Sequence, residues 1–226
     1  MENIVRILEI KEITHDTKQF RLEKPKGYHF IPGQATELSI NKPEWKDNKH
    51  PFTFTALNDD PFLQFTIKRY PDHHGMTDQL HRMEPGAELI VRDPWGAIEY
   101  RGPGYFLAGG AGITPFLAIF RQLHKDNQIK GNTLFFSNKT AADIIEHDEL
   151  LDILGVRVTF LLTRESASGP YLGPYLRGRI DEDFLKDQVS DLRQPFYICG
   201  PDEMVGKLTV ILKEMHAKTE SLIFEQ

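Results

Sequence analysis

The chain has 226 residues, a formal net charge of −6 at pH 7, 40% hydrophobic residues and one cysteine. That length fits one large domain or two of ordinary size, with enough apolar residues for a core. The acidic balance argues against a nucleic-acid partner bound by broad phosphate neutralisation. A single cysteine excludes an internal disulfide and cannot hold an iron–sulfur cluster. Since the apolar stretches are short and no apolar leader is present, we expect a cytoplasmic protein without membrane insertion.

The first hundred residues contain short runs in which apolar and polar residues alternate, which is typical of antiparallel strands. Gly and Pro punctuate these runs, and one short helix is expected over residues 77–83. The alternating runs lie at 20–22, 37–40, 63–67 and 88–91. The spacing predicts a small antiparallel β-barrel.

After the turn Arg101-Gly102-Pro103-Gly104, the pattern changes to strands that alternate with helices. Strands are expected at 105–108, 133–137, 156–162 and 196–199, helices at 115–125, 141–151, 181–189 and 202–218, and a last apolar run at 222–224. This order predicts a parallel sheet with helices on its faces. We therefore expect a β-barrel domain over residues 1–101 and an α/β domain over residues 102–226.

Three glycines and a proline follow the first predicted strand of the second domain, in the run Gly109-Gly110-Ala111-Gly112-Ile113-Thr114-Pro115. A glycine turn that leads into a helix brings backbone N–H groups and the positive end of the helix dipole to a phosphate. A tight strand–helix connection that binds nothing explains the same residues equally well.

Cys199-Gly200-Pro201 ends the fourth predicted strand of that domain. Open α/β sheets bind their ligands at the carboxyl ends of the strands, so Cys199 is expected to face the cleft. The alternative is a small buried hydrophobic residue, which is the commoner role of a lone cysteine.

Together, the glycine turn and Cys199-Gly200-Pro201 resemble the nucleotide domain of the ferredoxin–NADP reductase superfamily. Ser137-Asn138-Lys139-Thr140 and Gly178-Arg179-Ile180-Asp181 extend the resemblance, which covers essentially the whole chain and is nearest to the short flavodoxin or ferredoxin reductases. It implies FAD rather than FMN as cofactor, NAD(P)H as co-substrate, and a flavodoxin, ferredoxin, oxygenase component or small molecule as electron acceptor. The implied nucleotide contacts are Gly109, Gly110, Gly112, Ile113, Thr114, Pro115, Gly200 and Pro201.

The resemblance also implies a flavin site on the barrel. His50-Pro51-Phe52-Thr53 matches the family's arginine–aromatic–hydroxyl strand, but a histidine stands where the arginine holds the flavin diphosphate. A histidine is only partly charged near neutral pH, so the diphosphate is expected either to bind more weakly or to be supported by Lys68 or Arg69. Gly75-Met76-Thr77 approximates the family's second flavin turn. The alternatives are that His50 is an ordinary loop residue and that Thr77 only caps a helix.

Three residues are the implied catalytic set. Thr53 is expected near flavin N5, Cys199 near nicotinamide C4, and Glu225 is the candidate for a carboxylate that completes the site. The alternative for Glu225 is a solvated tail residue.

Thr163-Arg164-Glu165 resembles the segment with which NADP-dependent relatives hold the ribose phosphate, and Arg179 adds a second cation, so NADPH is favoured over NADH. Arg164 paired with Glu165 as a solvated ion pair is the alternative.

Two other functions compete with this interpretation. In the first, the chain is an NAD(P)H:flavin reductase that releases its flavin. In the second, it is a non-catalytic nucleotide-binding or electron-transfer module on the same fold.

Overall fold

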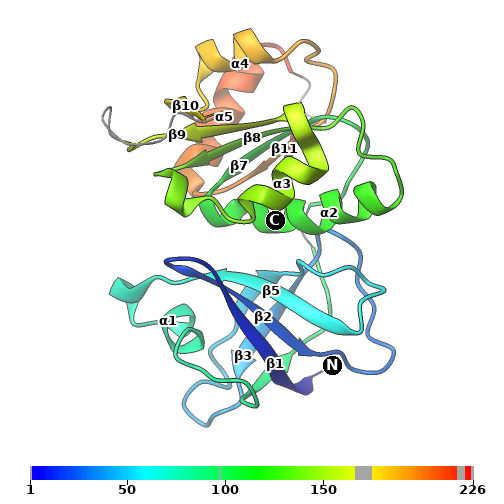
Figure 1. The fold of residues 1–226 in the computed structure, drawn as a ribbon, viewed down its shortest axis with the longest axis vertical. Coiled ribbons are helices and arrows are strands. Elements are labelled where there is room, and N and C mark those ends of the chain that lie inside the picture. Colours follow the sequence, from blue (N-terminus) through cyan, green and yellow to red (C-terminus); the bar gives the residue numbers. More distant parts are fainter. Residues whose placement is uncertain (1, 97, 166–174, 218–221, 225–226) are drawn as a thin grey trace.

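A computed structural model describes residues 2–96, 98–165, 175–217 and 222–224. Figure 1 shows the amino-terminal and carboxyl-terminal halves stacked along the long axis of the molecule, each built around its own sheet.

The amino-terminal half is an antiparallel, barrel-like sheet, as predicted. Its strands follow the order β4-β3-β6-β1-β2-β5, and alternate residues point into one apolar core. The strands are β1 (Asn3–Thr14), β2 (Thr17–Glu23), β3 (Ala35–Ile40), β4 (His50–Thr53), β5 (Phe62–Lys68) and β6 (Glu88–Val91). The short helix α1 (Met76–Leu80) begins and ends earlier than expected, and its first and last residues both pack in that core.

The carboxyl-terminal half is the predicted parallel sheet with helices on both faces. Its strand order is β10-β9-β8-β7-β11-β12, and every strand pair is parallel. The strands are β7 (Tyr105–Gly109), β8 (Thr133–Asn138), β9 (Val158–Leu162), β10 (Tyr175–Arg177), β11 (Phe196–Cys199) and β12 (Leu222–Phe224). The helices are α2 (Thr114–Lys125), α3 (His147–Leu154), α4 (Glu182–Gln188) and α5 (Asp202–Glu214).

The two faces of this sheet carry separate cores. Residues of β7 and β8 alternate between them, so that Phe106 and Phe136 pack under α2 and α3, while Leu107 and Phe135 pack under α4 and α5. The α2 and α3 face lies toward the barrel (Figure 1).

The helix expected over residues 141–151 is divided in two. A single 3₁₀ turn, Ala141–Asp143, is closed by the Asp143 carboxylate, which accepts hydrogen bonds from the Thr140 backbone N–H and hydroxyl. Glu146 then adopts a left-handed backbone conformation with φ of 53° and turns the chain into α3. The spacing of apolar residues does not reveal such a side-chain cap, so the break in the helix was not predicted.

Arg121 of α2 joins the two halves. Its guanidinium donates to the Thr55 carbonyl of the barrel, and its Nε and Nη2 atoms each lie 2.6 Å from a carboxylate oxygen of Glu149 on α3. Nearby, the Gln19 amide of β2 donates to Glu146 at 3.1 Å. Because these groups are largely buried, they hold α2 at a defined position against the barrel.

The segment that connects the two halves is also held by hydrogen bonds. The Arg101 backbone N–H donates to the Tyr197 hydroxyl at 2.8 Å, and that hydroxyl donates to the Gly102 carbonyl at 2.7 Å. Within the described ranges, the helices fall short of the length and apolar character that a membrane span needs.

Candidate active site

A cleft of about 730 Å³ lies between the barrel and the carboxyl ends of β7, β8, β9 and β11. Most of the residues predicted from the sequence line it: Pro51, Phe52, Thr53, Lys68, Thr77, Gly109, Gly110, Gly112, Thr114, Thr163, Arg179, Cys199, Gly200 and Pro201. Six predicted residues are not among its lining: His50, Gly75, Met76, Ile113, Pro115 and Arg164. Glu225 lies outside the described residues.

The glycine turn is packed directly against the loop after β11. A side chain at Gly112 would overlap the Cys199 carbonyl and come within 2.6 Å of the Gly200 nitrogen. Gly110 has a φ of +53°, and no heavy atom lies within 4 Å of where its Cβ would be. The glycines therefore allow a close approach between two loops at Gly112, and at Gly110 they leave the backbone open toward the cleft.

Helix α2 begins immediately after this turn. Pro115 occupies the first helical turn and Ile113 is fully buried, so these two residues shape the turn from behind the cleft. Thr114 lines the cleft, and its hydroxyl donates to the Ala111 carbonyl at 3.0 Å. The free N–H groups and positive dipole end of a 12-residue helix thus meet the cleft wall.

Thr53 and Cys199 line the same cleft from opposite halves of the molecule. Thr53 is the last residue of β4 and Cys199 the last residue of β11, and both are buried. The structure thus brings together two residues that are 146 positions apart in the chain.

The segment from His50 to Thr53 forms strand β4, and its first residue is not part of the cleft lining. His50 is half-buried, and its Nε2 atom lies 2.8 Å from the Asn48 Oδ1 atom. Met76 packs its side chain in the barrel core, next to Gly75 at the amino-terminal end of α1.

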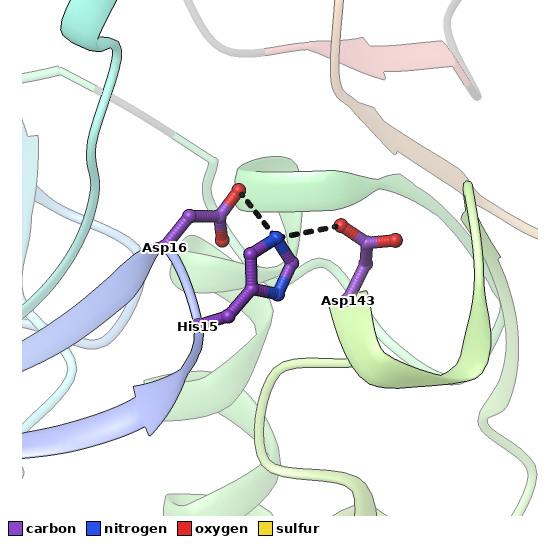
Figure 2. A group of neighbouring side chains, drawn as sticks. All are labelled: His15, Asp16 and Asp143. Carbon is purple, nitrogen blue, oxygen red and sulfur yellow. Dashed lines mark ion pairs between the residues drawn. The ribbon is translucent and has the colours of Figure 1, made fainter.

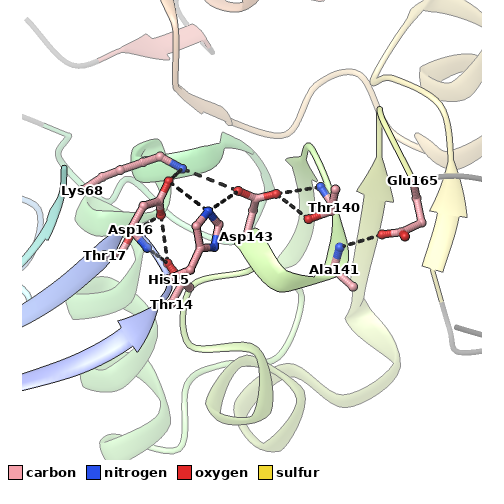
Figure 3. Close-up of polar contacts among 9 residues, drawn as sticks. All are labelled: Thr14, His15, Asp16, Thr17, Lys68, Thr140, Ala141, Asp143 and Glu165. Atoms are coloured by element: carbon pink, nitrogen blue, oxygen red, sulfur yellow. Dashed lines mark hydrogen bonds and ion pairs between the residues drawn. The ribbon is translucent and has the colours of Figure 1, made fainter. Parts of the chain in front are cut away.

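Lys68 forms ion pairs with two carboxylates where the halves meet (Figure 3). Its Nζ atom lies 2.8 Å from Asp16 Oδ2 and 3.9 Å from Asp143 Oδ1. The imidazole Nε2 of His15 lies 3.6 Å and 3.9 Å from the same two oxygens (Figure 2). His15, Asp16 and Asp143 could together offer three ligand atoms to a metal ion, but the Lys68 ammonium already supplies a cation to both carboxylates.

The pairing sets the protonation of Asp16. Burial raises the pKa of this carboxyl, but the hydrogen bond and charge of Lys68, helped by the Thr14 and Thr17 hydroxyls, outweigh burial and hold the pKa below 3.8. Arg69 is the other cation proposed for the diphosphate. Its Nε atom lies 2.8 Å from Asp78 Oδ1, so Arg69 is also paired with a carboxylate.

The loops after β8 and β9 are tied together beside the glycine turn. Thr163 donates its backbone N–H and its hydroxyl to the Asn138 carbonyl, at 2.9 and 3.1 Å. Glu165 accepts the Ala141 backbone N–H at 3.0 Å, as Figure 3 shows. Arg164 is exposed outside the cleft lining, so only Arg179 of the two predicted cations lies in the wall.

Asn138, for which no role was predicted from the sequence, lies in the cleft wall. Its side chain is 4% exposed, and neither its Oδ1 nor its Nδ2 atom has a hydrogen-bond partner among the described residues. Its position, a polar residue at the carboxyl end of a buried strand, was the available signal.

Two family models match the chain. Residues 5–100 match the oxidoreductase FAD-binding domain, and residues 106–209 match the oxidoreductase NAD-binding domain.

Curated relatives and solved structures agree with these matches. The chain is 24% identical over 220 residues to the ferredoxin–NAD(P)(+) reductase component of the naphthalene 1,2-dioxygenase system of Pseudomonas putida, with 96% of the chain covering 66% of that relative. It is 25% identical over 254 residues to human NADH-cytochrome b5 reductase 2, with 96% of the chain covering 92% of it. A ferredoxin NADP⁺ reductase from Neisseria gonorrhoeae, solved with FAD and NADP, has a TM-score of 0.81 at 20% identity, with coverage of 99% of this chain and 98% of that one. The chain thus spans a little under two thirds of the length of the first of these relatives.

A barrel that matches an FAD-binding domain, followed by a parallel sheet that matches an NAD-binding domain, defines the class as two-domain oxidoreductases with a site for each cofactor. The cleft lies where the two domains meet. The chain belongs to the ferredoxin–NADP reductase superfamily.

Proposed function

We propose that the chain transfers a hydride from NAD(P)H to a bound FAD and passes the electrons to a separate acceptor. The observation that carries this proposal is a single cleft with Thr53 in its barrel wall and with Cys199 and the glycine turn in its nucleotide-domain wall. Hydride transfer requires the two reacting rings to be held against each other with water excluded, and a cleft between two domains serves that purpose.

The nucleotide-domain wall fits a dinucleotide phosphate. Open backbone at Gly110, the start of α2 and the buried Asn138 amide offer hydrogen-bond donors without a cationic side chain. On the barrel side, Phe52 and Tyr70 supply aromatic surface and Thr53 a hydroxyl, which fits a flavin ring.

Each wall then has a defined task. A bound flavin supplies the ability to take up two electrons together and release them singly. The Thr53 hydroxyl orients the flavin edge by a hydrogen bond, and Cys199 packs against the nicotinamide. Since Gly112 and Cys199 are in contact through their backbones, the pyrophosphate turn and the nicotinamide wall form one rigid unit.

For the acceptor, we propose a redox protein. The relatives are named as reductase components of a dioxygenase and a monooxygenase and as cytochrome b5 reductases, which favours a protein partner. For the donor, Arg179 in the cleft wall favours NADPH, because a guanidinium pairs with a 2′-phosphate. We expect Arg179→Met to weaken NADPH binding about tenfold and to leave NADH binding unchanged.

A second candidate is reduction of a flavin that is then released. It is favoured by His50, which contacts Asn48 outside the cleft wall, and by the pairing of Lys68 with Asp16, because both reduce the positive charge available to a flavin diphosphate.

The test is a visible spectrum of the protein purified without added flavin, followed by anaerobic addition of NADPH or NADH. Flavin absorbance that bleaches with nucleotide, faster with NADPH, supports the proposal. Colourless protein that reduces added flavin selects the second candidate. Protein that neither takes up flavin nor oxidises either nucleotide refutes both.

A further inference from the structure

Asn138 differs from the other buried asparagine beside β8. Asn132 is fully buried and fully paired, through the Tyr100 hydroxyl, the Gly104 N–H at 3.3 Å and the Ile129 carbonyl at 3.1 Å. Asn138 is equally enclosed, but its amide oxygen and nitrogen have no partner in the described part of the chain. A buried amide without hydrogen bonds disfavours the folded state, so this position gains stability when a ligand pairs with it.

The place of Asn138 in the sheet identifies the part of the ligand that reaches it. On one side, Ser137 pairs with Gly109 at the start of the glycine turn. On the other side, the Asn138 carbonyl accepts both hydrogen bonds from Thr163. Asn138 therefore lies between two segments that line the same cleft.

The side chain extends on the face where α2 begins. Leu134 and Phe136 of β8 pack in the core under α2, and residues two apart in a strand share a face. The amide of Asn138 thus lies on the face of the sheet at which the glycine turn presents its free N–H groups.

From this arrangement, and resting on the proposed function, we infer that Asn138 positions the pyridine nucleotide by hydrogen bonds from its carboxamide to the ribosyl-pyrophosphate bridge. A dinucleotide that runs from the glycine turn to Thr163 carries that bridge across the end of β8. The carboxamide both donates and accepts, so it can pair with a phosphate oxygen and with a ribose hydroxyl.

The experiment measures binding without turnover. Asn138→Leu, which is close to isosteric, and Asn138→Ala are prepared in the full chain with flavin bound, and ADP-ribose is titrated by calorimetry. We expect the dissociation constant to rise about tenfold in both variants, the flavin content to stay unchanged, and the Tm of nucleotide-free Asn138→Leu to equal or exceed that of the wild type.

Asn132→Leu is the matched control. It removes an amide that is already paired, so we expect a lower Tm and an unchanged affinity for ADP-ribose. A purely structural Asn138 would behave like Asn132, with a lower Tm and no change in affinity.

Three results would overturn the inference: unchanged ADP-ribose affinity in both variants, loss of flavin with unchanged ADP-ribose affinity, or a loss of Tm like that of Asn132→Leu without a change in affinity. If the wild-type protein itself does not bind ADP-ribose, the proposed function fails and the inference fails with it. If the wild type binds and the variants bind equally well, only the role of Asn138 is refuted.

Discussion

The two walls of the cleft are built in different ways. The nucleotide-domain wall contains a stretch of bare backbone, with Gly110 open toward the cleft and Gly112 packed on the loop after β11. The barrel wall depends on side chains, and its charged member, Lys68, is already paired with Asp16. Where backbone groups bind the ligand, adding a side chain blocks binding. Where side chains bind it, a single substitution can raise or lower the affinity.

We expect the largest effect from Gly112→Ala. The new Cβ would overlap the Cys199 carbonyl, and backbone on both sides cannot move easily. The expected loss is about 3 kcal/mol of unfolding free energy, or roughly 10 °C in Tm, together with loss of ADP-ribose binding. Thermal denaturation and calorimetry measure the two effects.

Gly206→Ala is the control for that variant. Gly206 lies inside α5 with open space around it, so alanine there is expected to stabilise the protein by about 0.5–1 kcal/mol. Wild-type stability and binding in Gly112→Ala would show that the loop contact is not rigid.

The next largest effect is expected from removing the Arg121 contacts that join the two halves. Arg121→Met leaves Glu146 and Glu149 without their shared cation, and we expect a loss of about 2 kcal/mol in denaturant titrations, allowing for partial exposure of the pair. Lys125→Met, which breaks an exposed pair with Asp59, is expected to cost less than about 1 kcal/mol. Equal losses of unfolding free energy in the two variants would show that the buried pairing of Arg121 contributes no more than an exposed ion pair.

The Arg121→Met loss should also depend on pH. Burial, and then the charge of Glu149, raise the pKa of Glu146 above 4.5, and removal of Arg121 raises it further. A carboxyl with a raised folded-state pKa contributes stability below its unfolded pKa and loses that contribution as the pH rises. The deficit of Arg121→Met relative to the wild type is therefore expected to shrink from pH 8 toward pH 5.

A smaller effect is expected on the barrel wall from His50→Arg. An arginine is a permanent, forked cation at the position where the resemblance implies a contact with the flavin diphosphate, so flavin affinity should rise about tenfold. Fluorescence titration with FAD measures it, and His50→Gln, which removes the titratable group, is the control. Equal FAD affinities in wild type and His50→Arg would place the diphosphate away from residue 50.

The smallest effect is expected from Lys68→Met, which should change how Tm depends on pH below neutrality. Since Lys68 holds the pKa of Asp16 below 3.8, this pairing stabilises the protein above about pH 4 and is lost as the pH falls through the lower pKa. Without Lys68, burial raises the pKa of Asp16, so protonation of Asp16 no longer costs stability. The Tm of Lys68→Met should therefore fall less than that of the wild type between pH 6 and 3, and its deficit should be largest near neutral pH. Lys186→Met, in an exposed pair on α4, should leave this profile unchanged.

The contrast between the walls also explains what the sequence could predict. The parallel sheet and the strand–glycine–helix turn were predicted because glycine spacing and strand periodicity are local features. The strand β1 was not predicted, although it is long, because half of its residues are exposed and only two are buried.

Side-chain pairing was not predictable in the same way. The partners of Lys68 are Asp16, 52 positions earlier, and Asp143, 75 positions later, and no local pattern links them. The unpaired amide of Asn138 likewise depends on which neighbours the fold leaves without a donor or acceptor.

Helix α2 has a consequence for the order of events during turnover. It starts at the glycine turn and, seven residues later, Arg121 grips the Thr55 carbonyl, two residues beyond Thr53. About 10 Å of α2, from its first residue to Arg121, thus sets the distance between the glycine turn and the barrel segment that follows Thr53. We expect nucleotide exchange to proceed with the domains docked, so that the exchange rate is set by passage through the mouth of the cleft and not by hinge opening.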